Sequence, residues 1–161
     1  MRNTQISSSD DIIDSRDILA RIEELQDLRA DLEDTSEDAA ENLKTNEGNK
    51  DADIGELEEA LETAKQVLKD WDEDEEGREL KSLLDLADEC EGYVDDWKYG
   101  AALIRESYFT EYAEQLAEDI GDYNSRDVKW PYTCIDWEKA ADELKADYTT
   151  VDFDGVIYFV R

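Results

Sequence analysis

The clearest structural signal in the chain is the stretch IGELEEALETAKQVLKDW, residues 54–71. Its apolar residues recur at intervals of three and four, and they are Ile54, Leu57, Leu61, Ala64, Leu68 and Trp71. This spacing places them on one stripe of an α-helix, as in a coiled-coil seam with two apolar positions per heptad. A stripe this narrow packs against one neighbouring helix, so the sequence predicts a partner helix for residues 54–71.

The nearest candidate partner precedes it in the chain, from Ser15 onward. Ser15 is of a type favoured at helix N-caps, and Asp17 follows in the first turn, where a negative charge suits the helix dipole. Apolar residues then recur at heptad-compatible spacing, with Arg29 in the place of one of them, and they are Ile18, Ile22, Leu25 and Leu32. An antiparallel hairpin within one chain, or the same two helices paired in a dimer, would satisfy both seams.

A third apolar stripe follows between residues 80 and 97. Its members are Leu80, Leu83, Ala87, Cys90, Val94 and Trp97. Gly92 weakens the end of this helix, and whether the helix continues past it is left open. Three helices with matching seams predict an elongated acidic bundle over residues 15–100, preceded by a polar, flexible N-terminus over residues 1–14.

Residues 101–161 have a different pattern, which predicts a small α+β domain. Ser107 can cap a first helix that ends at Gly121, and Asp136 can cap a second, shorter one. The stretch between these helices holds the single proline of the chain, so we expect a loop there.

The end of the chain carries a hairpin signal, because Asp154-Gly155 lies between two runs rich in β-forming residues. With a two-residue turn, one face of this hairpin carries Val151, Phe153, Val156 and Tyr158. An isolated hairpin is marginal in water, so we expect this face to lie on the two preceding helices. The expected fold class is α+β, mostly α, with an N-terminal helical hairpin or coiled-coil bundle followed by two helices and a C-terminal β-hairpin.

Charge is the dominant feature of the composition. The chain has 47 acidic and 17 basic residues and no histidine, which gives a formal net charge of -30. Such a field repels nucleic acid, anionic membranes and phosphorylated ligands, and it favours a basic partner. Large basic surfaces commonly hold DNA or RNA, so the composition suggests a protein that imitates nucleic acid. Adaptation to high salt is an alternative, although proteins so adapted typically avoid lysine and Lys supplies 9 of the 17 basic residues here.

The linear density of charge agrees loosely with imitation of nucleic acid. Residues 16–35 and 52–72 each contain seven acidic residues, against three and two basic ones. As neighbouring helices about 30 Å long they carry roughly one net charge per 3 Å, compared with about one per 1.7 Å of duplex DNA. The candidate partner-binding residues are Glu24, Asp27, Asp31, Glu58, Glu62, Asp70, Asp72, Glu73, Asp74, Glu75, Glu76, Glu79, Asp95 and Asp96.

No motif points to catalysis or to a bound cofactor. Nucleophiles activated by histidine are excluded, and the seven glycines form no phosphate-binding loop. Cys90 and Cys134 are too few and too far apart for a zinc site. Residues 70–81 superficially resemble a calcium loop, but Glu75 stands where that loop needs glycine and Lys81 where it needs a bidentate glutamate. We therefore expect no enzyme activity, no cofactor and no dedicated metal site.

Two further properties bear on the compartment. The two lone cysteines fit a reducing environment. No stretch approaches about 18 consecutive apolar residues, and the first residues are polar, without the apolar segment of a signal peptide. The sequence therefore predicts a soluble, cytoplasmic protein.

The C-terminal third contains YFTEYAEQLAEDIG at residues 108–121 and WPYTCIDWEKAA at residues 130–141, followed by the hairpin. This region resembles the C-terminal module of small phage and plasmid accessory proteins, some of which are antirestriction proteins. In its acidity and its Ile135-Asp136-Trp137 segment it is similar to the ArdA-type antirestriction family, whose members are acidic DNA mimics. The resemblance implies a mobile-element origin and interference with a host defence nuclease of the restriction or CRISPR type. It does not extend to the N-terminal helices.

These features are consistent with three functions. The first is an anti-defence inhibitor that occupies the basic nucleic-acid groove of a nuclease, binding neither nucleic acid nor membrane directly. The second is a coiled-coil adaptor whose seams over residues 18–32 and 54–71 recruit a partner or form a homodimer. The third is an acidic chaperone for basic proteins, which would share the salt dependence of a mimic but lack one defined target.

Overall fold

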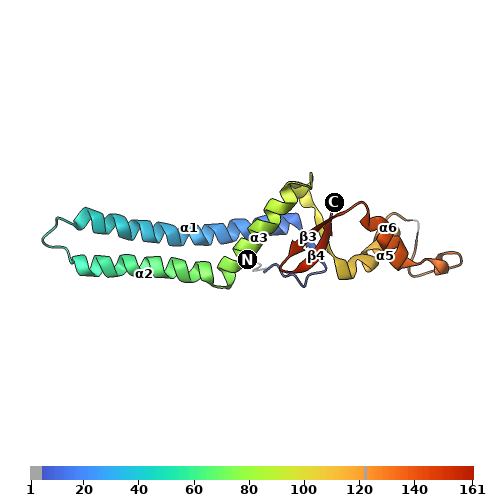
Figure 1. Cartoon of the computed structure of the whole chain (residues 1–161), viewed down its shortest axis with the longest axis horizontal. Coiled ribbons are helices and arrows are strands. Elements are labelled where there is room, and N and C mark those ends of the chain that lie inside the picture. Colours follow the sequence, from blue (N-terminus) through green and yellow to red (C-terminus); the bar gives the residue numbers. More distant parts are fainter. Residues whose placement is uncertain (1–4, 122) are drawn as a thin grey trace. The chain divides into compact units, whose positions relative to one another are not determined.

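A computed structural model describes residues 5–121 and 123–161 (Figure 1). The described chain is mostly helical with one four-stranded antiparallel sheet, which confirms the predicted α+β, mostly α class. It divides into two compact units, one of residues 20–84 and one of the described residues up to Leu19 together with residues 85–161. In chain order the elements are β1 (Ile12–Asp14), α1 (Ser15–Asn46), α2 (Ile54–Glu73), α3 (Glu75–Glu91), α4 (Trp97–Gly100), β2 (Ala102–Arg105), η1 (Glu106–Tyr108), α5 (Phe109–Asp119), η2 (Tyr132–Cys134), α6 (Trp137–Lys145), β3 (Thr149–Phe153) and β4 (Val156–Val160).

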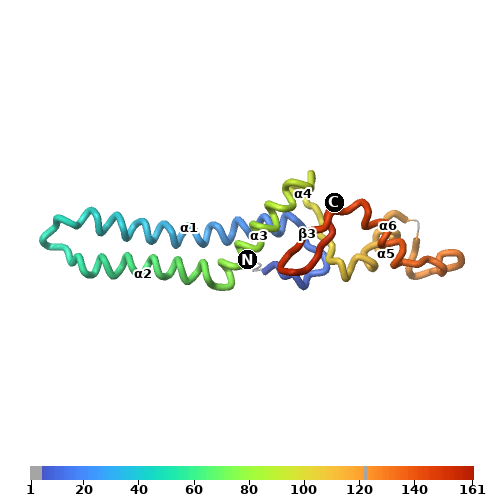
Figure 2. The backbone as a smooth tube through the Cα atoms, in the orientation of Figure 1, coloured from blue at the N-terminus to red at the C-terminus, as the bar shows by residue number. Residues whose placement is uncertain are grey.

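The unit of residues 20–84 is a hairpin of α1 and α2 that leads into α3, and Figure 2 traces its path. Along α1, positions spaced alternately by three and four residues are buried or half-buried over the whole helix. They are Ile18, Ile22, Leu25, Arg29, Leu32, Ser36, Ala39, Leu43 and Asn46. The predicted seam, from Ile18 to Leu32, is confirmed. It continues to Asn46, and polar side chains occupy three of its positions, Arg29, Ser36 and Asn46.

α2 lies beside α1 in the hairpin, and all six residues of its predicted seam are half-buried. No residue of α2 is fully buried, because a single neighbouring helix covers only one side of it. The helix begins at a capping residue, Asp53, whose carboxylate accepts a hydrogen bond from the backbone N–H of Glu56 at 3.2 Å. The two seams therefore pair within one chain, so a dimer is not required to satisfy them.

A tight corner separates α2 from α3. Asp74 has an extended backbone and its carboxylate accepts a hydrogen bond from the N–H of Gly77 at 3.1 Å, as an N-cap does. A Cβ atom at Gly77 would stand 2.3 Å from the carbonyl oxygen of Trp71, so only glycine fits the corner as it is built. The dense acidic run around residues 70–79 is thus a helix–turn–helix junction.

α3 ends at Glu91, directly before Gly92, which answers the question that the sequence left open. Val94 and Trp97 are buried as predicted, but they lie in the following turn and in α4. The third helix is therefore shorter than its apolar stripe, and residues 85–100 belong to the same compact unit as the sheet.

The sheet of that unit has the strand order β1-β2-β4-β3. Asp154 and Gly155 both have positive φ, at 50° and 80°, as a type I′ turn requires, and the predicted pairs Val151–Tyr158 and Phe153–Val156 are present. The expected packing is wrong in one respect, because α5 and α6 lie on the opposite face of the hairpin. Phe159 of that face joins Ile104, Phe109, Ala113 and Ala141 in one core cluster.

The N-terminal segment also differs from the prediction of a flexible end. Its described part contains β1, which pairs with β2, and Ile6 and Ile13 are buried. The expected N-cap, Ser15, is itself buried, where its hydroxyl donates to the carbonyl of Trp97 at 2.6 Å and accepts from the N–H of Ala101 at 2.8 Å. Asp14 takes the capping role instead, since its carboxylate accepts from the N–H of Arg16 at 2.8 Å.

Candidate protein-binding surface

Acidic side chains form a row along the outer face of α1, about half a turn from the seam. The row has the same three-four spacing as the seam, and it consists of Glu24, Asp27, Asp31, Asp34, Asp38 and Glu41, all exposed. The one basic residue between its ends, Arg29, lies on the seam rather than in the row. The face of α1 that points away from α2 is therefore uniformly negative over about 25 Å.

α2 carries a corresponding row on its own outer face. Positions with the same spacing are Glu56, Glu59, Thr63, Gln66, Asp70 and Glu73, all exposed. This row is acidic at both ends and neutral in the middle, and it also contains no basic residue. Lys69 lies beside the row, with its ammonium 3.9 Å from the carboxylate of Glu73.

The two rows lie on opposite sides of the hairpin, because each faces away from the shared seam. Together they present ten carboxylates over about 25 Å of helix, or roughly one per 2.5 Å. Duplex DNA carries about one phosphate per 1.7 Å of its axis, on two strands that wind around it, so the similarity is in sign and in linear density. The arrangement can thus offer a basic groove a regular series of anionic acceptors.

Arginines that face inward fix the geometry between the helices. Arg29 lies on the seam, and its guanidinium donates to both carboxylate oxygens of Asp72, at 2.7 and 3.2 Å, and also to Glu33. The hydrogen bonds to Asp72 raise the pKa of Arg29 above its ordinary value. This contact ties the middle of α1 to the end of α2 and uses the charge of Asp72 internally.

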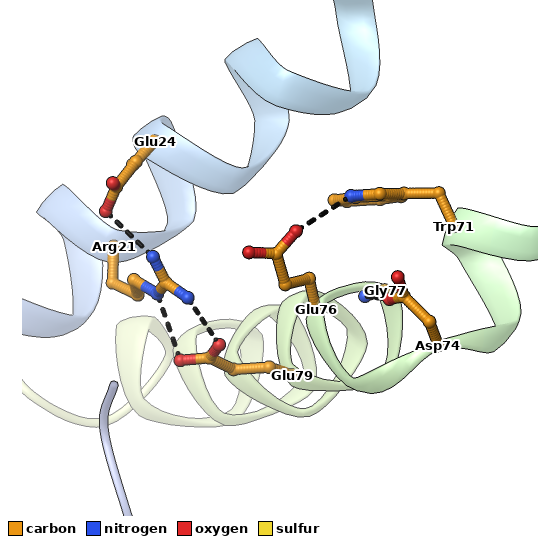
Figure 3. A network of polar contacts seen from close by, with 7 residues as sticks. All are labelled: Arg21, Glu24, Trp71, Asp74, Glu76, Gly77 and Glu79. Carbon is orange, nitrogen blue, oxygen red and sulfur yellow. Dashed lines mark hydrogen bonds and ion pairs between the residues drawn. The ribbon is translucent and has the colours of Figure 1, made fainter. Parts of the chain in front are cut away.

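A second arginine, Arg21, contacts two carboxylates (Figure 3). Arg21 is 6% exposed, and its guanidinium makes a bidentate contact with Glu79 at 3.1 and 2.7 Å and a third bond to Glu24 at 2.9 Å. The Glu79 side chain is equally buried, at 6%. Bidentate arginine–carboxylate pairs are among the strongest and most directional ion pairs, so this one fixes α1 against α3.

Two further carboxylates of the corner have structural roles. The indole N–H of Trp71 donates to Glu76 at 3.0 Å, and Asp74 caps α3 (Figure 3). Both bonds orient the corner at the end of the two rows.

The residues predicted from the sequence therefore separate into six groups. Glu24, Asp27, Asp31, Asp70 and Glu73 belong to the outer rows, while Glu58 and Glu62 are exposed on the flanks of α2. Asp72, Asp74 and Glu76 hold the corner, and Glu75 is exposed in the first turn of α3. Glu79 is buried in its ion pair, so it does not belong to the exposed acidic surface. Asp95 and Asp96 are exposed in the turn before α4, in the other unit.

Sequence reasoning missed five members of the rows. These are Asp34, Asp38, Glu41, Glu56 and Glu59. Their signal was available, since the acids repeat at the heptad spacing of the seam but out of phase with it.

The remaining chemistry of the described residues is limited. Within residues 5–121 and 123–161, no three Cys, Asp or Glu side chains are grouped so that they could hold a metal ion. In the same ranges, no helix combines the length and the apolar character needed to cross a membrane. Burial raises the pKa of the Cys90 thiol to about 12, which keeps this cysteine protonated and unreactive at neutral pH.

Comparison of the chain with protein-family models, with curated proteins and with solved structures gives no match in any of the three.

Proposed function

We propose that this protein is a non-enzymatic inhibitor that imitates nucleic acid and occupies the basic groove of another protein. The observation that supports this best is the pair of outer carboxylate rows on the hairpin, from which basic residues are absent. Ordinary exposed helices alternate Glu with Lys at i,i+4, which stabilises the helix. Four ion pairs at i,i+3 or i,i+4 occur on α1 and α2, but eight of the ten acids in the outer rows take no part in them, and a function that uses the field explains this excess of charge.

The physics of exposed charges sets how such binding would behave. One exposed ion pair contributes at most about 1 kcal/mol, so useful affinity requires many pairs at once. Their combined field also speeds encounter with a basic partner, and salt screens both effects. The proposal therefore implies affinity that falls steeply with ionic strength.

The kind of target rests on the resemblance of residues 108–161 to antirestriction modules. On this basis the target is a host defence nuclease of the restriction or CRISPR type, the protein is encoded by a phage or another mobile element, and it acts in the host cytoplasm. Two free cysteines are consistent with that compartment.

Capture from a bacterial lysate, with and without competing DNA duplex, tests this function. The proposal expects basic nucleic-acid-binding proteins to be retained at low salt and released by duplex or by high salt. Retained proteins that duplex does not displace would contradict it, as would a complete absence of duplex-sensitive binding.

The coiled-coil adaptor is a second candidate, and one observation favours it. One side of the hairpin is apolar and exposed, around Leu28 and Val67. An adaptor would bind through this side, and charge neutralisation on the outer rows would then have little effect.

A further inference from the structure

The two long sides of the hairpin, between its outer rows, have opposite character. One side is charged and laced with ion pairs, including those of Arg29 with Glu33 and Asp72. The other side has small or apolar residues, and they are Leu28, Thr35, Ala60 and Val67. The hairpin therefore has one charged side and one apolar side, in addition to its apolar seam and its acidic outer rows.

The apolar side forms a groove. Its volume is about 550 Å³. It is lined by Leu32 and Thr35 of α1 and by Glu56, Glu59, Ala60, Thr63, Ala64 and Val67 of α2. Leu28 and Val67 are 41% and 46% exposed, which is high for aliphatic side chains on two helices that already face each other. The groove therefore joins seam residues, Leu32 and Ala64, to neighbouring residues that remain exposed to solvent.

We propose that this groove binds an amphipathic, basic α-helix of a partner protein. Such a helix would place its apolar stripe in the groove and complete a three-helix coiled coil. The half-buried seam of α2, which has no fully buried residue, would then be covered on its second side. The α2 residues that line the groove span residues 56–67, or about 17 Å, so about three turns of the docked helix make contact.

Charge identifies the occupant as basic. Glu56 and Glu59 of α2 line the groove, and Asp31 and Asp38 of α1 lie within one helical turn of its lining residue Thr35. The whole unit of residues 20–84 has 23 acidic and 8 basic residues, a net charge of -15. A second copy would bring the same acidic borders into contact and be repelled, whereas a helix with Lys or Arg beside its apolar stripe would be attracted.

This inference does not depend on nucleic-acid mimicry. The groove shares Glu56, Glu59 and Thr63 with the α2 row, but its other lining residues are uncharged and lie outside both rows. The lining of the groove includes no residue of the α1 row. Substitutions can therefore separate the two.

A synthetic peptide of two LKKLLKL heptads is a suitable probe, with binding measured by titration calorimetry against the full chain. A second peptide with Glu in place of every Lys keeps the apolar stripe and reverses the charge. The proposal expects binding of the lysine peptide and none of the glutamate peptide. Absence of binding by the lysine peptide would overturn it.

The matched variants are Val67→Gln in the groove lining, Leu28→Gln on the same side of α1, one turn before Leu32, and Leu84→Gln in α3, where Leu84 is similarly exposed at 39%. Because all three positions are exposed and Gln is a good helix former, circular dichroism should show unchanged helix content. Val67→Gln should weaken binding of the lysine peptide about tenfold, Leu28→Gln should weaken it as well, and Leu84→Gln should leave it unchanged. Equal binding by all four proteins would show that the peptide is held by charge alone and would refute the groove.

Two controls keep the result unambiguous. Neutralising Asp27, Asp34 and Glu41 on the outer row should weaken binding to a basic nucleic-acid groove. In the chain with these three acids neutralised, Val67→Gln should still weaken binding of the lysine peptide. Sedimentation should show a monomer without peptide. A dimer that Val67→Gln dissociates would mean that a second copy fills the groove, against the proposal.

Discussion

The buried guanidinium of Arg21 is held between two carboxylates, and its hydrogen bonds to Glu79 are the main cause of its raised pKa. Removing one partner of a buried ion pair leaves the other charge without compensation. We therefore expect Arg21→Met to lower the free energy of unfolding by about 3–5 kcal/mol. Urea denaturation would measure this.

The double variant Arg21→Met/Glu79→Leu serves as the control for that effect. It removes both charges, so much of the lost stability should return. Lys65→Met, which disrupts an exposed pair with Glu62, should change the stability by less than about 1 kcal/mol. Equal losses for Arg21→Met and Lys65→Met would contradict the internal role of Arg21.

Tyr158 gives the sheet-containing unit a dependence on alkaline pH. Burial raises its pKa from 10.0 to about 12, and its hydroxyl donates to the carbonyl of Asp10 at 2.6 Å. The folded state keeps this proton at a pH where the unfolded chain loses it. The contribution to stability is therefore complete below pH 10 and is lost as the pH rises toward 12.

Tyr158→Phe tests this pH dependence. It should lower the free energy of unfolding at neutral pH by about 1 kcal/mol, since one hydrogen bond is lost. It should also make the fall of the melting temperature between pH 10 and 12 shallower, without abolishing it, because burial likewise raises the pKa of Tyr148 to about 12. An alkaline fall as steep as that of the wild type would rule out the assigned role.

At the scale of elements, the junction of α2 and α3 depends on a single glycine. Gly77→Ala would place a methyl group against the backbone of Trp71 and Asp72, so one of the helices must shift. We expect a loss of about 1–3 kcal/mol on chemical denaturation. Gly48→Ala is the matched control, because nothing lies within 4 Å of a Cβ atom there. Similar stability of the two variants would mean that the corner is not constrained as the structure indicates.

The helices were predictable because their signals are local. Heptad spacing located the seams of α1 and α2. Asp53 and Asp136 each cap the start of a helix, where their carboxylates accept hydrogen bonds from the backbone N–H groups of Glu56 and Lys139. The C-terminal hairpin was equally predictable, since the turn residues and the register follow from Asp154-Gly155.

What sequence reasoning missed depends on contacts between distant residues. β1 and β2 are short, and they are strands because β1 pairs with β2 and β2 pairs with both β1 and β4, all of which are distant in sequence. Likewise, nothing local says which face of a two-sided hairpin meets α5 and α6, because both faces carry large apolar residues. Val151 and Phe153 occupy one face and Phe159 the other, and all three are buried.

The same distinction applies to the candidate site. The outer rows follow from periodicity, and a search for acids out of phase with the seam would have found them. Glu79 could not be assigned from its neighbours, because its partner Arg21 is distant in sequence. Its carboxylate forms the ion pair with Arg21 that holds α1 against α3.

At the scale of the whole molecule, the net charge of -30 includes acids that form internal ion pairs and acids that are exposed on the surface. On the hairpin, Arg21 and Arg29 face inward, where each contacts two carboxylates. Of the ten acids in the outer rows, two contact a basic side chain, Glu24 with Arg21 and Glu73 with Lys69, and the other eight take no part in an ion pair in the described structure. Under the proposed function, specific acids of the outer rows, rather than the total charge of the chain, would bind a basic groove.

The most direct test neutralises three acids of the α1 row, Asp27→Asn, Asp34→Asn and Glu41→Gln, and compares them with three exposed acids of the other unit, Asp119→Asn, Glu138→Gln and Asp147→Asn. Both variants have the same net charge. The measurement is the affinity for the protein captured in competition with duplex, determined over a series of salt concentrations. The account predicts that the row variant binds more weakly and with a shallower salt dependence, while the other variant stays close to wild type. Equal effects of the two variants would contradict it, because total charge alone would then explain the binding.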